Sequence, residues 1–334
     1  MKHSSAILMI FIILMTIVAS CQTTPVLTAY PPSTAFTLTQ INTTAPLTTT
    51  VQGGVSTLTG TVTKTNTITS PVTLPTTSSS LPYSSTTKTN IIIDHTNWDW
   101  YNNQPQQVFE RVAALRIFFS HASVGEKIMN GFDALNSANP IKYPLGQIVA
   151  DANPPVTTTN GIIYQYYEGN PGWSQKISDF KAHVNSGWHD TKVDIAMNKF
   201  CYIDAYLPGV DWTIYRDSMV ALEAQYPNTK FVYMTMPLLT VDDGVGVQRA
   251  QFNQAMRDWI ATQNGKLLFD IADIEAWSPS GEHQTFTYNG TAYELAYSAY
   301  TSDGGHPNAE GSQRLAIGLY SLFGREIDSM YKSL

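Results

Sequence analysis

The strongest indication of the fold lies in the stretch Leu115-Arg116-Ile117-Phe118-Phe119-Ser120-His121-Ala122-Ser123-Val124-Gly125. Its first half is a compact, mainly apolar run that predicts a buried strand, and apolar residues recur at helical spacing from Val124 to Leu135. The chain therefore passes from a strand through a tight turn into a helix. A serine in such a turn is exposed at the end of the strand, beside helix N–H groups that favour a developing negative charge.

The same alternation of strand and helix patterns continues toward the C-terminus. Strands separated by helices predict an α/β fold with a mainly parallel sheet, covered by helices on both faces and wound right-handedly. Ligands of such sheets bind at the carboxyl ends of the strands. The further strands are predicted at 193–201, 231–236 and 267–271, and the other helices at 103–115, 174–184, 212–225, 248–263 and 309–323.

Two serines of the first turn are candidate nucleophiles. Ser123 stands at the head of the helix, whereas Ser120 lies nearer the strand. We favour Ser123, because Val124-Gly125 leads directly from it into the helix, although serine is also a common helix cap and a structural role stays open. A serine also needs a base before it can attack a carbonyl carbon.

A candidate base lies in the stretch Ser302-Asp303-Gly304-Gly305-His306-Pro307-Asn308. The two glycines allow a turn that folds the carboxylate of Asp303 back onto the imidazole of His306, where it would fix the tautomer and stabilise the imidazolium. Asn308 suits the N-cap of the last helix. The alternative is a structural or solvated histidine at a helix start.

These two blocks resemble the first and last blocks of the SGNH (GDSL-like) hydrolase family. The last block, Asp-x-x-His-Pro-Asn followed by Gly311 and a helix, is the close match, whereas the first reads Ser-His-Ala-Ser-Val-Gly in place of Gly-Asp-Ser-Leu. The resemblance covers about residues 112 to 325. It implies a three-layer α/β/α, flavodoxin-like fold and a catalytic triad of Ser123, His306 and Asp303.

The resemblance also implies an oxyanion hole made from the N–H of the nucleophile, a glycine N–H and an asparagine side chain. Asn198, near the end of the predicted strand 193–201, is the matching asparagine, with Lys199 as a rival donor and a buried structural amide as the alternative. Gly169 is the matching glycine, together with Gly172, although ordinary turn glycines fit the same stretch.

The implied chemistry is acyl transfer to water, which requires neither a metal nor an organic cofactor. His306 would take the proton of Ser123, the serine oxygen would attack an ester carbonyl, and water would hydrolyse the acyl-enzyme. Because the histidines show no His-x-x-x-His spacing, we do not expect a metal-dependent hydrolase.

The N-terminal part of the chain predicts export and a lipid anchor. The apolar run 6–19 is shorter than the roughly 20 residues that cross a bilayer, which is typical of a signal peptide. The run ends in Val18-Ala19-Ser20-Cys21, which resembles a bacterial lipobox, so we expect 1–20 to be a lipoprotein signal peptide and Cys21 to carry acyl chains. The alternative is an ordinary secretory signal. The expected location is the outer face of a bacterial membrane, at the cell surface or in the periplasm.

Residues 21–90 predict a disordered tether, and residues 91–334 predict the catalytic domain. Of the 69 residues from 22 to 90, 24 are Thr and 8 are Ser, without apolar periodicity, although the Thr runs leave a small β domain as the alternative. Residues 91–334 carry 16 basic and 26 acidic residues, a formal net charge of −10. This balance argues against a nucleic-acid partner.

The sequence is compatible with three functions. The first is a surface-tethered serine esterase that removes acetyl or other short acyl groups, including those of acylated polysaccharides, because a domain on a stalk meets extracellular polymers. The second is an O-acyltransferase of the same family, which would use a sugar hydroxyl in place of water. The third is a non-catalytic glycan-binding or adhesion lipoprotein on a degenerate hydrolase fold.

Overall fold

A computed structural model of the chain describes residues 89–149, 160–186 and 193–332. The expectations for the signal peptide, the lipidated Cys21 and the tether fall almost entirely on residues outside these ranges. Within the described part of the chain, no helix is both long enough and apolar enough to span a bilayer.

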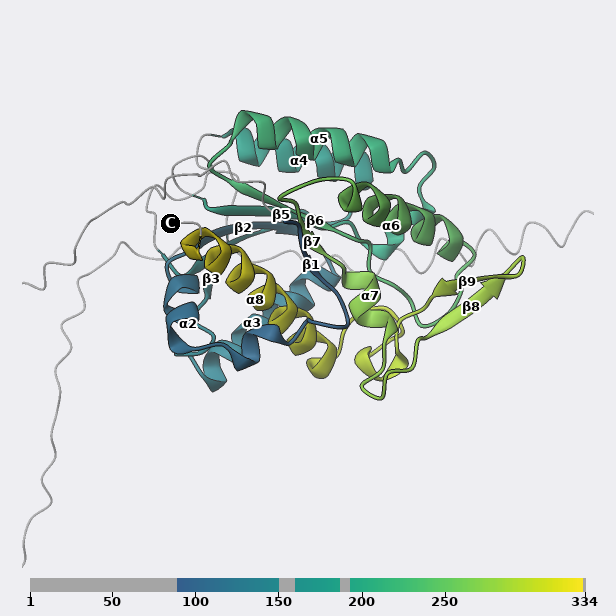
Figure 1. Ribbon diagram of the computed structural model, residues 1–334. Helices are drawn as coiled ribbons and strands as arrows, with labels where there is room; N and C mark the ends of the chain where they lie inside the picture. Colours follow the sequence, from purple (N-terminus) through teal and green to yellow (C-terminus); the bar gives the residue numbers. More distant parts are fainter. Residues whose placement is uncertain (1–88, 150–159, 187–192, 333–334) are drawn as a thin grey trace, which may run out of the picture. The chain divides into compact units, whose positions relative to one another are not determined.

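The centre of the fold is a parallel sheet, to which the described residues contribute seven strands (Figure 1). Every neighbouring pair of strands runs parallel. The strands are β1 (Ile91–Ile93), β2 (Arg116–His121), β3 (Gly146–Val149), β4 (Ile162–Tyr167), β5 (Ile195–Asn198), β6 (Lys230–Met234) and β7 (Leu267–Phe269).

The strand order is β1-β7-β6-β5-β2-β4-β3. Without the two edge strands β1 and β3, the order read from the other end is β4-β2-β5-β6-β7. Numbered by their order along the chain, these five strands are 2-1-3-4-5. This 2-1-3-4-5 order defines the flavodoxin-like doubly wound fold. The predicted fold class is therefore confirmed by the topology of the sheet.

Helices cover both faces of the sheet and complete three layers (Figure 1). On one face lie α2 (Gln106–Val112), α3 (Val124–Ala138) and α8 (Ala309–Lys332), and on the other lie α4 (Trp173–Asn185), α5 (Trp212–Gln225) and α6 (Gly246–Ala261). Successive side chains of a strand point to opposite faces. Accordingly, Ile117 and Phe119 of β2 belong to the core under α3 and α8, and Phe118 belongs to the core under α4 to α6.

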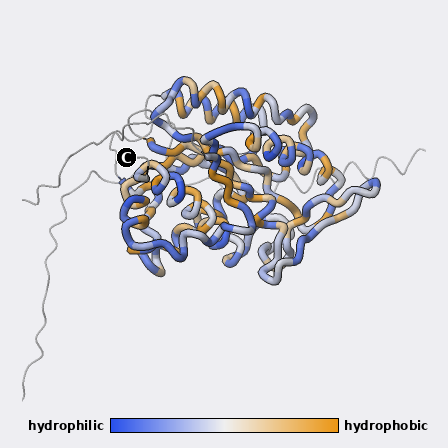
Figure 2. Tube along the Cα trace, viewed as in Figure 1, coloured by the Kyte–Doolittle hydropathy of each residue, from blue (hydrophilic) through white to orange (hydrophobic). Residues whose placement is uncertain are grey.

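The hydropathy of the chain follows these layers. The strands carry the most hydrophobic stretches, and the helices are hydrophilic on their outer surfaces (Figure 2). The remaining elements are α7 (Ile271–Ala276), the antiparallel hairpin β8 (Thr285–Tyr288) and β9 (Thr291–Glu294), and the short helices η1 (Trp100–Asn103), η2 (Tyr202–Tyr206) and η3 (Ser298–Tyr300).

Several predicted boundaries were wrong. The helix predicted at 103–115 is the shorter α2, because Pro105 occupies its N-cap in an extended conformation and keeps Gln104 extended as well. The strand predicted at 193–201 ends at Asn198, where the chain turns toward η2. The last helix continues beyond 323, and Gly324 fits because a Cβ at this position would lie 3.0 Å from the rings of Trp100 and Tyr101.

The sequence prediction also missed β1, β3 and β4. The strand β1 has only three residues, and β4 is buried only at Ile163 and Tyr164 and carries the polar Gln165 at its centre, so it does not form a continuous apolar run. Both strands are fixed by long-range pairing, β1 with β7 and β4 with β2. The missing β4 matters for the site, because its carboxyl end lies beside the end of β2.

Candidate active site

The site lies at the topological switch point of the sheet, between β2 and β5. The chain leaves β2 toward β4 on one side and returns on the other side to form β5, so the connections diverge here. Crevices at such points, at the carboxyl ends of the strands, bind the ligands of doubly wound sheets. The segment after β2 carries Ser123, and β5 ends in Asn198.

Ser123 adopts a strained conformation at the N-cap of α3. Its φ of 54° and ψ of −104° are rare for a residue that is not glycine. The side chain makes no capping hydrogen bond to the described helix. Its conformation turns the hydroxyl away from the helix and toward His306, so capping does not account for this serine.

A tight approach of β2 to α3 maintains this turn. A Cβ placed on Gly125 would lie 2.4 Å from Cβ of His121, closer than real side chains come. His121 is itself fully buried and hydrogen-bonds through Nε2 to Gln165 of β4 at 2.9 Å. Glycine at 125 thus allows the last residue of the strand and the first turn of the helix to pack directly together.

Three of the residues predicted as catalytic are brought together. Oγ of Ser123 lies 2.6 Å from Nε2 of His306, and Nδ1 of His306 lies 2.7 Å from Oδ2 of Asp303. The other carboxylate oxygen of Asp303 accepts hydrogen bonds from the backbone N–H groups of Gly305 and His306, at 3.1 and 2.8 Å. Gly304, with φ of 90°, makes the turn that folds the carboxylate back.

The electrostatics of this chain of hydrogen bonds fix the protons. The backbone N–H of His306 lowers the pKa of Asp303 to about 2, and the imidazole and the Gly305 N–H contribute to the same shift. An ionised carboxylate can only accept, so Nδ1 of His306 carries the proton and Nε2 is free to accept one from Ser123. The side chain of His306 is 29% exposed, which leaves the pair open to a substrate.

The loop that carries His306 is closed by backbone contacts. Thr301 and Pro307 form an antiparallel bridge, and the N–H of Ser302 donates to the carbonyl of His306 at 2.9 Å. Asn308 caps α8 as predicted, accepting from the N–H of Gly311 at 3.0 Å. The base therefore sits on a rigid loop.

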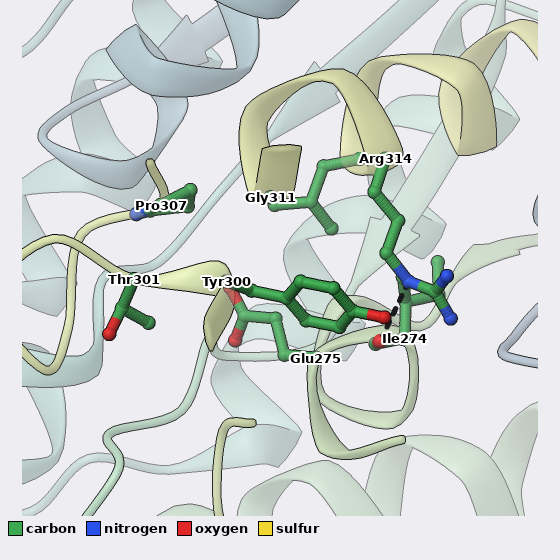
Figure 3. A pocket seen from close by; sticks show the side chains of 8 residues that line it. Ile274, Glu275, Tyr300, Thr301, Pro307, Gly311 and Arg314 are labelled. Carbon is green, nitrogen blue, oxygen red and sulfur yellow. Dashed lines mark hydrogen bonds between the residues drawn. The ribbon is translucent and has the colours of Figure 1, made fainter. Parts of the chain in front are cut away.

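Behind this loop lies a small cavity of about 10 Å³, which is about the space of one water molecule (Figure 3). Arg314 reaches across it and donates from Nε to the carbonyl of Ile274 at 3.3 Å. A cavity of this size admits no ester and belongs to the packing of the loop. It is lined by Ile274, Glu275, Tyr300, Thr301, Pro307, Gly311, Arg314 and Leu315.

Ser120 and Asn198 meet a different partner, Glu168. Ser120 is fully buried and donates to Oε2 of Glu168 at 2.6 Å, and the side-chain amide of Asn198, which is 1% exposed, donates to the same oxygen at 3.0 Å. Sheet register explains the contact, because Ser120 of β2 lies directly opposite Asn198 of β5. Of the two candidate serines, the structure thus brings Ser123, and not Ser120, to the imidazole.

Glu168 was not assigned a role from the sequence. It follows β4 directly, and its N–H donates to the carbonyl of His121 at 2.9 Å. Burial raises the pKa of its carboxyl group to about 7. The only sequence signal was an acidic residue next to the predicted oxyanion glycine, and without β4 that signal had no structural context.

The remaining predicted donors lie close by. Lys199 is fully buried, and its Nζ donates to the carbonyl of Phe200 at 3.1 Å. Gly169 follows Glu168 with φ of 68°, and Gly172 stands at the N-cap of α4 with φ of 100°. Because His121 pairs with Tyr167, Gly169 lies at the same edge of the sheet as Ser123. The conformations of both glycines also suit ordinary turns, so Gly169 as an oxyanion donor stays a prediction.

Tyr202 is a neighbour of the triad that the sequence reasoning missed. The Ser123 hydroxyl is among the groups that act on the pKa of its phenol, so the two hydroxyls are neighbours. The centre of its ring lies 5.8 Å from that of His306, edge to face. It comes directly after the predicted strand 193–201, so its place at the carboxyl edge of the sheet was the signal that could have found it.

One group of residues has the composition of a metal site. Single donor atoms of Asp94, His95 and Asp273 lie within 4.8 Å of one another. The imidazole Nδ1 of His95, however, lies 2.6 Å from the carboxylate of Asp273, and its ring stacks on Trp277 at 4.1 Å. These contacts describe a hydrogen-bonded histidine held by an aromatic ring. The group follows β1 and β7, and β6 and β5 separate it from β2.

The fold and the site define a doubly wound α/β domain in which a serine, an imidazole and a carboxylate form a hydrogen-bonded series at the switch point of the sheet. No family model matches the chain, and neither does any curated protein. Among solved structures, it is similar to a carbohydrate esterase family 3 from Talaromyces cellulolyticus, with 18% identity, coverage of 66% of this chain and 99% of that one, and a TM-score of 0.41.

A second similar structure is a member of the lipolytic protein G-D-S-L family from Veillonella parvula. The identity is 16%, the match covers 64% of this chain and 100% of that one, and the TM-score is 0.37. The likeness of this chain to SGNH (GDSL-like) hydrolases is carried by its own strand order and by the contacts of Ser123, His306 and Asp303.

Proposed function

We propose that this chain is a serine esterase of the SGNH (GDSL-like) type, which hydrolyses carboxylic esters through an acyl-enzyme. The observation that carries the proposal is the continuous hydrogen-bonded path from Ser123 through His306 to Asp303 at the switch point of the sheet. A nucleophile, a base and a group that orients the base define this kind of catalysis on many unrelated folds.

The reaction follows from the positions of the protons. Nε2 of His306 takes the proton of the Ser123 hydroxyl as Oγ attacks the ester carbonyl carbon, and Asp303 stabilises the imidazolium that forms. The tetrahedral intermediate collapses, the imidazolium gives its proton to the leaving alcohol, and the serine remains acylated. A water molecule then gives a proton to the same nitrogen and attacks the acyl carbon. The bond from that carbon to Oγ breaks, the imidazolium returns the proton to Oγ, and the acid is released.

The position of Ser123 at the start of α3 assists this chemistry. The backbone N–H groups at a helix N-terminus are directed toward a bound anion, and the helix dipole favours negative charge there. The intermediate carries its negative charge on the former carbonyl oxygen, beside Ser123. Preorganised donors at that place stabilise the transition state more than the substrate.

The substrate class within this proposal is an acetyl or other short acyl ester on an extracellular glycan. Support comes from the sequence alone: a signal peptide, a lipidation site at Cys21 and a Thr- and Ser-rich tether would place the esterase on an outer membrane face, among polymers. An O-acyltransferase or a glycan-binding protein on the same fold would differ in the assay that follows.

The test uses the purified full-length chain with p-nitrophenyl acetate and a serine-directed fluorophosphonate. We expect turnover that Ser123→Ala and His306→Ala each abolish, and a phosphonyl adduct that peptide mass spectrometry locates on Ser123. Ser120→Ala is the matched control, because Ser120 contacts Glu168 and not His306.

Each other outcome assigns a different function. Turnover that persists in Ser123→Ala would end the proposal. A chain that is inert to both reagents but binds acylated glycans would be the non-catalytic lipoprotein. Ester cleavage that requires an added sugar acceptor would identify the acyltransferase.

A further inference from the structure

After β5, the side chain that neighbours Ser123, the proposed nucleophile, is not the expected asparagine. Asn198 is nearly fully buried, and its amide donates to Glu168 at 3.0 Å, on the side of the sheet edge where Ser120 also donates. The loop that continues from Asn198 enters η2, whose first residue, Tyr202, has a phenol that neighbours the hydroxyl of Ser123.

Two surfaces hold the ring of Tyr202 in place. On one side it meets the imidazole of His306 edge to face, with ring centres 5.8 Å apart. On the other it packs against Gly305, where a Cβ would lie only 3.0 Å from two ring carbons of the tyrosine. Gly305 therefore makes room for this aromatic ring, and Gly304 makes the turn.

The backbone of η2 is anchored by buried charges. Asp204 accepts from the N–H of Cys201 at 2.7 Å and from Nζ of Lys176 at 2.6 Å, and all three residues are buried. The carbonyl of Tyr202 also accepts from Arg249 of α6 at 3.4 Å. A donor on such a fixed element costs little reorganisation when charge develops during the reaction.

We propose that the phenolic hydroxyl of Tyr202 is the side-chain donor to the oxyanion, in the role that the family resemblance assigns to Asn198. This inference rests on the proposed esterase function. When Oγ of Ser123 bonds to the ester carbon, the carbonyl oxygen becomes attached to that same carbon. The ring of Tyr202 packs against the imidazole that holds Oγ at 2.6 Å, so its hydroxyl is placed to reach the new oxyanion and to donate a hydrogen bond without transferring the proton.

The protonation state of Tyr202 suits a donor. Burial is the largest cause that raises its pKa to about 12, and the nearby Cys201 and Asp303 add to the shift. The phenol therefore stays protonated throughout the neutral range. A phenolate at this place would instead repel the developing oxyanion.

The test compares Tyr202→Phe with Tyr206→Phe in the full-length chain on p-nitrophenyl acetate. Tyr206 lies in the same short helix, but this residue is half exposed and its hydroxyl donates to Asp243 at 2.7 Å. We expect Tyr202→Phe to lower kcat by about 10- to 1,000-fold with KM within about twofold, because an oxyanion donor acts mainly in the transition state. Tyr206→Phe should retain the wild-type kcat and KM.

A second replacement is independent of any change in packing. Difluorotyrosine at position 202 keeps the hydroxyl but makes it more acidic. The alkaline decline of kcat should therefore begin at a lower pH than in the wild type. Wild-type kcat in Tyr202→Phe, or an unshifted pH profile of the difluorotyrosine enzyme, would overturn the role of Tyr202 and leave the esterase intact. Loss of the esterase itself is recognised separately, by turnover that persists in Ser123→Ala.

Discussion

At the scale of single residues, two carboxyl groups at the same edge of the sheet have opposite environments. Asp303 is 55% exposed and accepts from two backbone N–H groups and an imidazole, which lowers its pKa to about 2. Glu168 is 8% exposed, and the cost of burying its charge raises its pKa to about 7, although Ser120 and nearby lysines act in the other direction. Hydrogen bonding thus dominates at one carboxyl group and desolvation at the other.

The raised pKa of Glu168 predicts a pH dependence of stability. Between about pH 4.3, the ordinary pKa of an unfolded glutamate, and pH 7, the folded chain holds a proton that the unfolded chain has lost. Stability from this group is therefore fully present below about pH 4 and is lost as the pH rises through 7. Relative to wild type, Glu168→Gln should gain about 1 to 3 kcal/mol in the free energy of unfolding between pH 5 and pH 8.

Urea titrations at a series of pH values measure this difference. Burial also raises the pKa of Glu275 to about 8 and lowers that of His121 to about 4. Both groups are present in wild type and in Glu168→Gln, so the difference between the two curves reports Glu168 alone. The control is Glu110→Gln, at an exposed site on α2, which should follow the wild type at every pH. Parallel curves for wild type and Glu168→Gln would show that Glu168 is ionised in the folded chain.

At the scale of elements, the β2–turn–α3 unit is the one that creates the site. The strand is buried from Ile117 to His121, the turn holds Ser123 at positive φ, and the helix begins directly after this serine. Gly125 permits this geometry because His121 lies directly against its α-carbon. The sequence predicted the order of these elements from periodicity, but the strain at Ser123 follows from how tightly the two elements pack.

Gly125→Ala should therefore disturb both stability and activity. The new Cβ would lie 2.4 Å from Cβ of His121, and neither the strand nor the helix can move freely. We expect a loss of about 1 to 3 kcal/mol in the free energy of unfolding, with a fall in esterase activity as Ser123 shifts. Urea denaturation and p-nitrophenyl acetate turnover measure the two effects.

Gly146→Ala is the matched control for this prediction. Its Cβ would make an ordinary contact at 3.4 Å with the end of the Ile162 side chain in the neighbouring strand. It should retain wild-type turnover and change the stability by less than Gly125→Ala. Equal effects at both sites would refute the packing explanation for Gly125.

Over the full length of the chain, the proposed catalytic domain follows an N-terminal segment of very different composition. Residues 91–334 hold all 26 acidic residues of the chain, whereas the preceding 90 are dominated by Thr, Ser and apolar residues. Membrane attachment through Cys21 stays a prediction from the sequence, because this cysteine lies outside the described residues.

Cys21→Ser tests that prediction. Each methylene group of an acyl chain contributes about 0.8 kcal/mol to membrane binding, so the wild-type chain should sediment with membranes and Cys21→Ser should not. Immunoblots of membrane and soluble fractions measure the distribution. The only other cysteine, Cys201, is buried in the fold, so Cys201→Ser should stay with the membranes. Identical fractionation of wild type and Cys21→Ser would favour an ordinary secretory signal.

The succession of strands and helices, the doubly wound class and the block from Asp303 to Asn308 could be predicted without coordinates, because periodicity, glycine turns and helix caps act over a few residues. Helix α5 was predicted with its observed bounds, 212–225. Which hydroxyl meets the imidazole depends on the folded arrangement, since Ser123 and His306 are 183 residues apart. Sheet register turned Ser120 and Asn198 toward Glu168, and the path of the chain after β5 brought Tyr202 to the nucleophile. Local spacing carries no information about such contacts, because they depend on which strands become neighbours.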